Sequence, residues 1–181
     1  GFSPMTIILI ILVFYLILGC FMDSLSMILL TIPIFWPIVQ GLDFNFVSLV
    51  ELQSARLEDL VASGKEVPAA LLAEAQSLLA NGQELSREMT RELKLRGVSN
   101  GAFNRVNIEH TAIWFGILVL IVVEVGLITP PVGMNLFIAS YRFKKPVAEL
   151  YRATLPFMAV LMVALALITY VPWLSLAWMS D

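Results

Sequence analysis

The chain is poor in charged residues and in the residue types that carry covalent or metal-dependent chemistry. Charged side chains make up 14% of its 181 residues and hydrophobic ones 59%, whereas about a quarter of a typical soluble domain is charged. It has one histidine and one cysteine, and no His-x-x-x-His, Cys-x-x-Cys or Gly-x-Ser-x-Gly motif, so its sequence does not predict an enzyme. The single Cys20 excludes an intramolecular disulfide, and the net charge of -3 predicts no nucleic-acid partner. This composition predicts an integral membrane protein in contact with lipid.

The few charges that are present divide the chain into zones. Asp23 is the only charged residue between positions 5 and 42, and Glu124 is the only one between positions 111 and 141. The polar stretch between these apolar zones carries ten acidic and seven basic residues. We therefore expect an all-α membrane protein with a helical hairpin (1–42), an inserted extramembrane helical segment (43–110), a broken transmembrane helix (111–143), and a loop with the last transmembrane helix (144–181).

The first zone predicts two short helices joined by a tight turn. Residues 5–18 and 25–39 are apolar and flank the sequence Gly19-Cys20-Phe21-Met22-Asp23-Ser24. At 1.5 Å per residue each arm reaches about 21 Å, which is less than the roughly 30 Å of a bilayer's hydrocarbon. This length favours a re-entrant hairpin over two full spans whose connecting loop lies in water.

The third zone has the length of a membrane span but is interrupted by the sequence Thr129-Pro130-Pro131-Val132-Gly133. Pro130 and Pro131 have no backbone N–H and disfavour helix in the preceding residue, so carbonyls near Gly126 to Thr129 lose their helical partners. Such groups are tolerated inside a membrane only where protein, water or an ion satisfies them. Broken helices of this kind form the ion and substrate sites of secondary transporters, whereas a simple proline kink is the alternative without a ligand.

The polar zone has helix caps of its own. Ser48 to Glu51 matches a capping box, Gly64 and Asn81-Gly82 are suitable helix ends, and a third helix is expected from about Gln83 to Arg96. Residues 100–107 are expected to form a loop. Because the apolar stripes of these helices are narrow, the helices need one another, a partner or the membrane surface.

Basic residues in the loop at residues 140–152 predict the side of the membrane on which it lies. Four bases lie next to two membrane segments: Arg142, Lys144, Lys145 and Arg152. An excess of basic residues marks cytoplasmic loops, so this loop is expected to be cytoplasmic. The final span, from Leu155 to about Tyr170, then ends on the opposite side, which is also the side of the insertion.

Four polar residues in the apolar zones are candidates for a site at the two interruptions. Thr129 lies at the break and offers a hydroxyl and a carbonyl to a hard cation, and Asn135 follows on the first turn after the break, where it can bind a ligand. Asp23 and Glu124 are ionisable, and such residues within a membrane are functional by default. The alternatives are that Asp23 only caps the second arm of the hairpin, and that Glu124 pairs with a cation elsewhere or faces a water-filled cavity.

Two motifs resemble one known family. The sequence GLITPPVGMNLF at residues 126–137 looks like the signature of the large membrane subunit of tripartite ATP-independent periplasmic (TRAP) transporters, the DctM family. The sequences GCFMD at 19–23 and IPIFWP at 32–37 resemble the second hairpin of that family. The matching zones, residues 5–42 and 111–180, occur in the family's order.

The resemblance implies an elevator-type transporter of the ion-transporter superfamily. It would be a sodium symporter that imports C4-dicarboxylates or similar carboxylates, with Na⁺ as the coupling ion and no cofactor. Two sets of site residues and the break itself are carried over by similarity: sodium-binding Gly19, Gly126, Thr129 and Val132, substrate-binding Ser24 and Asn135, and the prolines Pro130 and Pro131.

The resemblance also implies partners and a location. The partners are a periplasmic solute-binding protein that delivers the acid, a small DctQ-like membrane subunit, and membrane lipid. The location is the bacterial inner membrane, with several passes, the insertion (43–110) and the C-terminus in the periplasm, and the loop at 140–152 in the cytoplasm.

The sequence departs from the family's pattern in two ways. The family's first repeat is missing, so we expect the chain to be the C-terminal half of a permease, with a site that the first repeat completes. The insertion replaces a short link, and it is either a docking element for the binding protein or another subunit, or a passive appendage. The alternative to transport is a membrane-anchored scaffold that presents this insertion.

Overall fold

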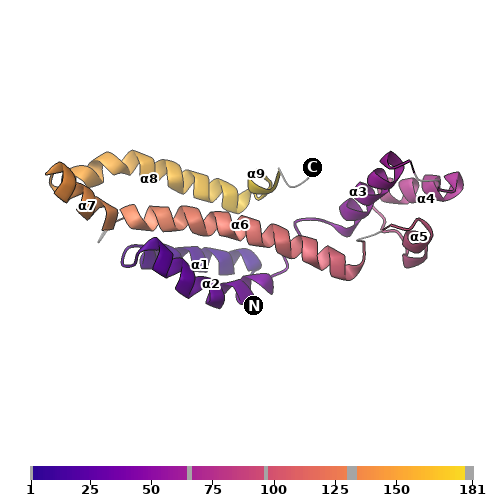
Figure 1. Ribbon diagram of the computed structural model, residues 1–181, viewed down its shortest axis with the longest axis horizontal. Helices are drawn as coiled ribbons and strands as arrows, with labels where there is room; N and C mark the ends of the chain where they lie inside the picture. The colour runs from indigo at the N-terminus through magenta and orange to yellow at the C-terminus, as the bar shows by residue number, and fades with distance from the viewer. Residues whose placement is uncertain (1, 65–66, 96–97, 130–133, 178–181) are drawn as a thin grey trace. The chain divides into compact units, whose positions relative to one another are not determined.

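The computed structural model describes residues 2–64, 67–95, 98–129 and 134–177, which form α-helices and no strand (Figure 1). The expectation of an all-helical protein is therefore confirmed for this part of the chain. The helices are α1 (Pro4–Gly19), α2 (Ser24–Gln40), α3 (Leu49–Ala62), α4 (Ala69–Ala80), α5 (Arg87–Glu92), α6 (Asn100–Ile128), α7 (Met134–Phe143), α8 (Val147–Tyr170) and α9 (Trp173–Leu176).

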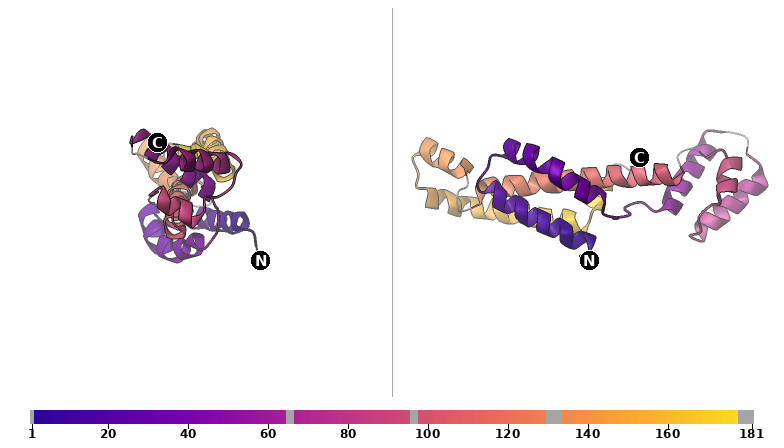
Figure 2. Two further views of the ribbon diagram at one scale, coloured as in Figure 1. Left: turned by 90° about the vertical axis from the view of Figure 1, so that its right-hand side faces the viewer. Right: turned by 90° about the horizontal axis from the view of Figure 1, so that it is seen from below.

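Helices α1 and α2 form a hairpin with arms of 16 and 17 residues (Figure 2). Ser3 caps α1 by accepting the Thr6 N–H, and Pro4 occupies the first turn, where its missing N–H costs nothing. The buried hydroxyls of Tyr15 and Thr31 lie 2.6 Å apart and join the two arms. At 1.5 Å per residue the arms reach about 24–26 Å, still short of the roughly 30 Å of hydrocarbon, so their length favours a hairpin over two spans.

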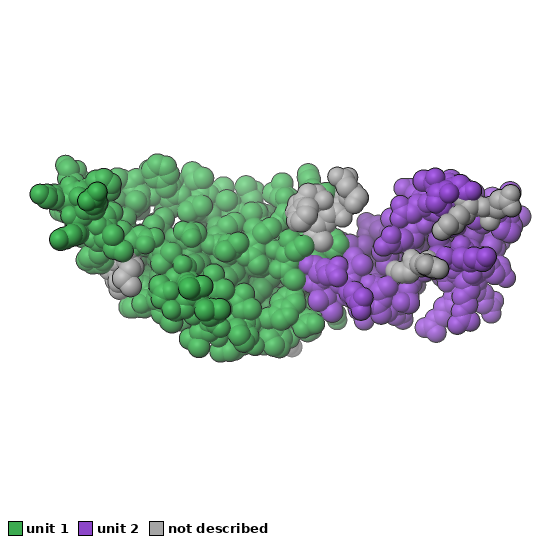
Figure 3. All heavy atoms as spheres, in the orientation of Figure 1, with its two compact units in different colours: residues 1–44, 110–181 green, residues 45–109 purple. Residues whose placement is uncertain are grey.

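The chain separates into two compact units, shown in different colours in Figure 3. The first unit comprises residues 1–44 and 110–181, and the second comprises residues 45–109. The boundary runs through α6, which begins in the second unit and ends in the first.

Within the first unit, α6 lies between the hairpin and α8 (Figures 1 and 2). Trp114 of α6 is fully buried, and its indole Nε1–H donates to the Ile168 carbonyl of α8 at 2.8 Å. Both helices are long and apolar enough to cross a membrane, but 56% of the most apolar stretch of α6 is buried, against 11% of that of α8. We therefore expect the exposed apolar surface of α8 to contact lipid or another protein.

The predicted loop at residues 100–107 is wrong, because these residues are the first two turns of α6. The Ser99 hydroxyl accepts the Ala102 N–H at 3.3 Å, and the Ser99 carbonyl accepts the Phe103 N–H at 2.9 Å. Serine in this position starts a helix, and its effect exceeds the turn preference of Asn100-Gly101.

The loop predicted at residues 140–152 is much shorter in the structure. Residues 140–143 complete α7 and residues 147–152 open α8, so residues 144–146 connect the two helices. Lys144 adopts a positive φ of 53°, and Ser140 donates its hydroxyl to the Lys145 carbonyl at 2.6 Å, which closes the turn. Pro146 then precedes the first turn of α8, where a proline is favourable.

The second unit has a small core of its own. Helices α3 and α4 and the segment around α5 contribute five buried side chains: Leu57, Leu60, Ala75, Leu85 and Leu93. The predicted capping box is confirmed, since Ser48 and Glu51 satisfy each other's backbone N–H. Gly64 and Gly82 follow the ends of α3 and α4 with φ of 64° and 72°, a backbone conformation that glycine adopts without strain.

Helix α5 begins at Arg87, later than the predicted start at 83, and Gln53 binds the segment that precedes it. The buried Gln53 amide accepts the Leu85 N–H at 2.8 Å and donates to the Leu85 carbonyl at 3.5 Å. Ser86 then caps α5 by accepting the Met89 N–H. Lys94, with a φ of 51°, ends the helical turn.

The two ends of the second unit are joined by one side chain. Asn107 accepts the Val47 N–H at 3.0 Å and donates to the Val47 carbonyl at 3.2 Å. The unit therefore leaves and returns to the chain at neighbouring points, which is typical of an inserted segment.

We expect Gln53→Met to loosen the segment around Leu85, because two buried backbone groups would lose their partner at a cost of about 2 kcal/mol. Hydrogen exchange at the Leu85 amide should accelerate by roughly 10- to 30-fold. The exposed Gln76→Met on α4 is the matched control and should leave this amide unchanged. Equal exchange in the Gln53→Met variant and the parent would contradict the bridging role.

Candidate functional site

The turn of the hairpin packs directly against the end of α6 through two glycines. A Cβ placed on Gly19 would lie 2.9 Å from the Gly126 Cα, and one placed on Gly126 would lie 2.7 Å from the Gly19 Cα. Ordinary carbon–carbon contacts are about 3.5–4.0 Å, and the obstructing atoms are backbone, so neither position has room for a side chain. The structure thus brings together two residues that the family resemblance assigned to one sodium site.

This contact lies where two helices end. Gly19 is the last residue of α1, and Gly126 is in the last turn of α6. The C-terminal end of a helix carries a partial negative charge from carbonyls that have no helical partner. Two such ends with their backbones in contact favour a cation.

The backbone hydrogen bonds at the end of α6 change partners, so the carbonyls there do not all stay without one. Residue 130 is proline and has no N–H to donate to the Gly126 carbonyl, so this carbonyl accepts the Thr129 N–H at 3.1 Å instead. The Thr129 hydroxyl donates to the Val125 carbonyl and lies 3.8 Å from the Met158 sulfur of α8. With its proton committed to Val125, the Thr129 oxygen has lone pairs available for a cation.

Part of the predicted site lies outside the described residues, namely Pro130, Pro131 and Val132. Asn135 is exposed on the first turn of α7, at the N-terminal end of that helix. A helix N-terminus carries a partial positive charge, which suits an anionic ligand.

Asp23 caps α2, the second arm of the hairpin, which is one of the two roles expected for it from the sequence. It precedes α2, and its carboxylate accepts the Ser26 N–H at 2.9 Å, while Ser24 is the first residue of the helix. Glu124 is exposed on α6, between the buried residues Val123 and Val125, so its carboxylate points away from the face that packs on the hairpin.

Several polar residues of the hairpin were not identified as site candidates from the sequence. Tyr15 and Thr31 hold the hairpin arms together, and the Cys20 thiol donates to the Leu16 carbonyl at 3.3 Å next to the glycine contact. Each is a polar group in an apolar run, and the need of such a group for a partner is the signal that could have identified it. Met158 of α8 is an apolar residue in an apolar run, so nothing in the sequence pointed to it.

The donors at the contact are carbonyls and a hydroxyl. Among the described residues no three His, Cys, Asp or Glu side chains are grouped as metal ligands. Oxygen donors without carboxylates suit a monovalent hard cation better than zinc or calcium, which take thiolate, imidazole or carboxylate ligands.

We expect Gly126→Ala to separate the hairpin from α6, because the added methyl group meets the Gly19 backbone. The cost should be about 1–3 kcal/mol, as for other overpacked sites, and should appear as a lower thermal midpoint of the purified protein. Gly116→Ala in the same helix is the control, since a Cβ there meets nothing within 4 Å. Alanine at position 116 should leave the midpoint unchanged or raise it. A Gly126→Ala protein as stable as the control would contradict this packing.

Comparison with known proteins covers most of the chain. The family model for the DctM component of the tripartite ATP-independent periplasmic transporter matches residues 1–174. The C4-dicarboxylate TRAP transporter large permease protein DctM of Pseudomonas aeruginosa is 46% identical over 65 residues, 36% of this chain and 15% of that protein. The DctM protein of Vibrio cholerae is 43% identical over 63 residues, 35% of this chain and 14% of that protein.

A third relative differs in its cargo. The ectoine TRAP transporter large permease protein TeaC of Halomonas elongata is 38% identical over 61 residues, 34% of this chain and 14% of that protein. The aligned part of the chain thus spans about 15% of these relatives' length. No solved structure gives a match. Because the family model covers residues 1–174, this chain belongs to the DctM family of TRAP transporter large permease subunits.

Proposed function

We propose that the chain forms the C-terminal half of the large membrane subunit of a sodium-coupled secondary transporter that imports organic acids. The observation that carries this proposal is the backbone contact between Gly19 and Gly126, where α1 and α6 end together. Family membership supports the transport function, and the contact supports a cation site within it.

In this proposal Na⁺ lies beside the glycine contact. The carbonyls of Gly19 and Gly126, the Thr129 hydroxyl and the Val132 carbonyl supply its oxygen ligands. The Gly126 carbonyl accepts one hydrogen bond, from Thr129, so a second lone pair remains for the ion. The partial negative charge of both helix ends adds to the attraction.

The substrate's acidic group is proposed to bind on the α7 side of the site. Ser24 and Asn135 stand at the N-terminal ends of α2 and α7, where an anion is favoured. Asp23 already accepts the Ser26 N–H at the start of α2 and is itself negative, so we place the carboxylate nearer to Asn135. Glu124 is exposed and is not needed as a ligand in this arrangement.

The chemical class of the substrate is proposed no more narrowly than organic acids. The names of the relatives include C4-dicarboxylate and ectoine, and a permease protein of Oleidesulfovibrio alaskensis, 40% identical over 58 residues, is named for isethionate. Cargo therefore differs among proteins of similar sequence, and C4-dicarboxylates are one candidate among several.

The rest of the transporter is proposed from the family. A periplasmic binding protein delivers the acid, a small DctQ-like subunit and the first repeat complete the permease, and hairpin and broken helix move together as in an elevator. The protein lies in the inner membrane, with the turn at residues 144–146 in the cytoplasm and the insertion and C-terminus in the periplasm. The scaffold alternative is not favoured, because the family is one of permeases.

The first test is Thr129→Val, which keeps the shape of the side chain and removes its oxygen. Sodium-driven uptake in proteoliposomes, with the intact permease, small subunit and binding protein, should fall by at least tenfold, roughly the value of one lost charge-assisted contact. Thr169→Val is the matched control, because Thr169 also donates to the carbonyl four residues earlier but lies in α8. Uptake that is equal in the two variants would refute the sodium site.

The second test concerns the insertion, which we propose docks the binding protein or another subunit. Replacing residues 49–98 with a short Gly-Ser linker keeps both Val47 and Asn107, so the junction stays closed, and Ser99 still caps α6. Uptake that depends on the binding protein should be lost in this variant. Normal uptake would show that the insertion is a passive appendage.

A further inference from the structure

We propose that a cavity in the second unit, between α5 and the start of α6, binds a dianion through Arg87, Arg91 and Lys94. The cavity has a volume of about 760 Å³, and its polar lining also includes Thr90, Ser99 and Asn100. Small-molecule sites are typically 300–1,000 Å³, so the space suits a small anion with part of its hydration. This site is separate from the transport site, which lies in the first unit.

The three cationic side chains lie on one side of α5 and the turn that follows it. Arg87 and Arg91 are one helical turn apart, and Lys94 follows three residues later. Cations spaced in this way repel one another and make the helix less stable. Among the residues that the structure describes, no carboxylate forms an ion pair with any of the three. A bound anion would remove this repulsion.

The acidic residues of α5 do not offset these charges within the cavity. Glu88 and Glu92 are on the same short helix, but neither lines this cavity. The described residues that line it therefore carry three positive charges and no negative one.

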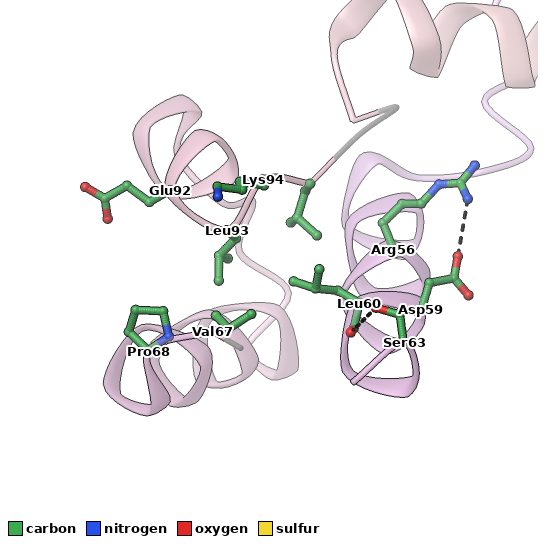
Figure 4. A pocket seen from close by; sticks show the side chains of 10 residues that line it. Arg56, Asp59, Leu60, Ser63, Val67, Pro68, Glu92, Leu93 and Lys94 are labelled. Atoms are coloured by element: carbon green, nitrogen blue, oxygen red, sulfur yellow. Dashed lines mark hydrogen bonds and ion pairs between the residues drawn. The ribbon is translucent and has the colours of Figure 1, made fainter. Parts of the chain in front are cut away.

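A neighbouring cavity in the same unit differs in the charges of its lining residues. It has a volume of about 700 Å³ and contains Arg56 and Asp59, which form an ion pair at 3.2 Å (Figure 4). Glu92 and Lys94 also line it, so the charges of its described lining residues balance. Of these two cavities, the one on the α6 side of α5 has the excess of positive charge among its described lining residues.

The chemistry of the cations indicates the class of ligand. Arginine presents its N–H groups as a fork that matches the two oxygens of a carboxylate or a phosphate, and lysine adds a point charge. Two arginines and one lysine suit a dianion such as a dicarboxylate or a phosphate. The start of α6 adds partial positive charge at the same place. The dianion comes either from a soluble acid or from a phospholipid headgroup.

The test is a binding measurement on the whole purified chain in a neutral detergent. Succinate and inorganic phosphate are titrated as soluble probes, and short-chain phosphatidic acid, whose phosphomonoester headgroup can carry two negative charges, is compared with phosphatidylcholine as the headgroup probe. Binding should weaken at least threefold in Arg91→Gln, since one exposed charge pair is lost, and should weaken as ionic strength rises. Arg105→Gln is the control, because Arg105 is an exposed arginine in the same unit that does not line the cavity.

Each outcome decides the proposal. Binding of succinate or phosphate that weakens in Arg91→Gln but not in Arg105→Gln supports it with a soluble anion as the source. The same pattern for phosphatidic acid alone supports it with a headgroup as the source. Binding that is absent, or that both variants weaken equally, overturns it. Hydrogen exchange at the Leu85 amide confirms that each variant keeps the fold of the unit.

Discussion

The contact between Gly19 and Gly126 is the constraint on which the first unit depends. It sets the hairpin against α6 at backbone distance, which no residue with a side chain at either position allows. Because of it, the C-terminal ends of α1 and α6 meet, and Thr129 directly follows the end of α6. In the proposed function, close packing of small residues and a cation site are the same feature, because the absence of side chains that brings the helices together would also leave their carbonyl ends open to an ion.

Polar groups in the apolar interior are all accounted for in the described part of the chain, where no buried side-chain nitrogen or oxygen is without a partner. The Tyr15–Thr31 pair joins the hairpin arms, and the Trp114 indole joins α6 to α8. In the second unit Gln53 performs the same function for the segment that precedes α5. Each of these hydrogen bonds connects two segments, so the same bond gives the polar group a partner and holds the two segments together.

Features of the fold that depend on neighbouring residues were predicted correctly from the sequence. The length of the hairpin arms, the Ser48 capping box and the capping role open to Asp23 follow from neighbouring residues and agree with the structure. The predicted start of α5 was wrong, because the segment before it is bound by Gln53, which lies 32 positions from Leu85. The predicted start of α6 was wrong as well, because the Ser99 cap outweighs the turn preference of the Asn-Gly pair. Family resemblance, and not spacing, placed Gly19 and Gly126 in one site, because a contact between distant glycines leaves no periodic signal. The roles of the site residues in transport stay predictions.

Hydrogen exchange of the intact permease in sodium, compared with potassium at equal ionic strength, tests the cation site most directly. If Na⁺ binds between the hairpin and the end of α6, exchange should slow in residues 17–22 and 124–129 together, because the ion holds both backbones. Sodium that leaves both segments unchanged, or that slows exchange only elsewhere in the protein, would contradict a site at the glycine contact.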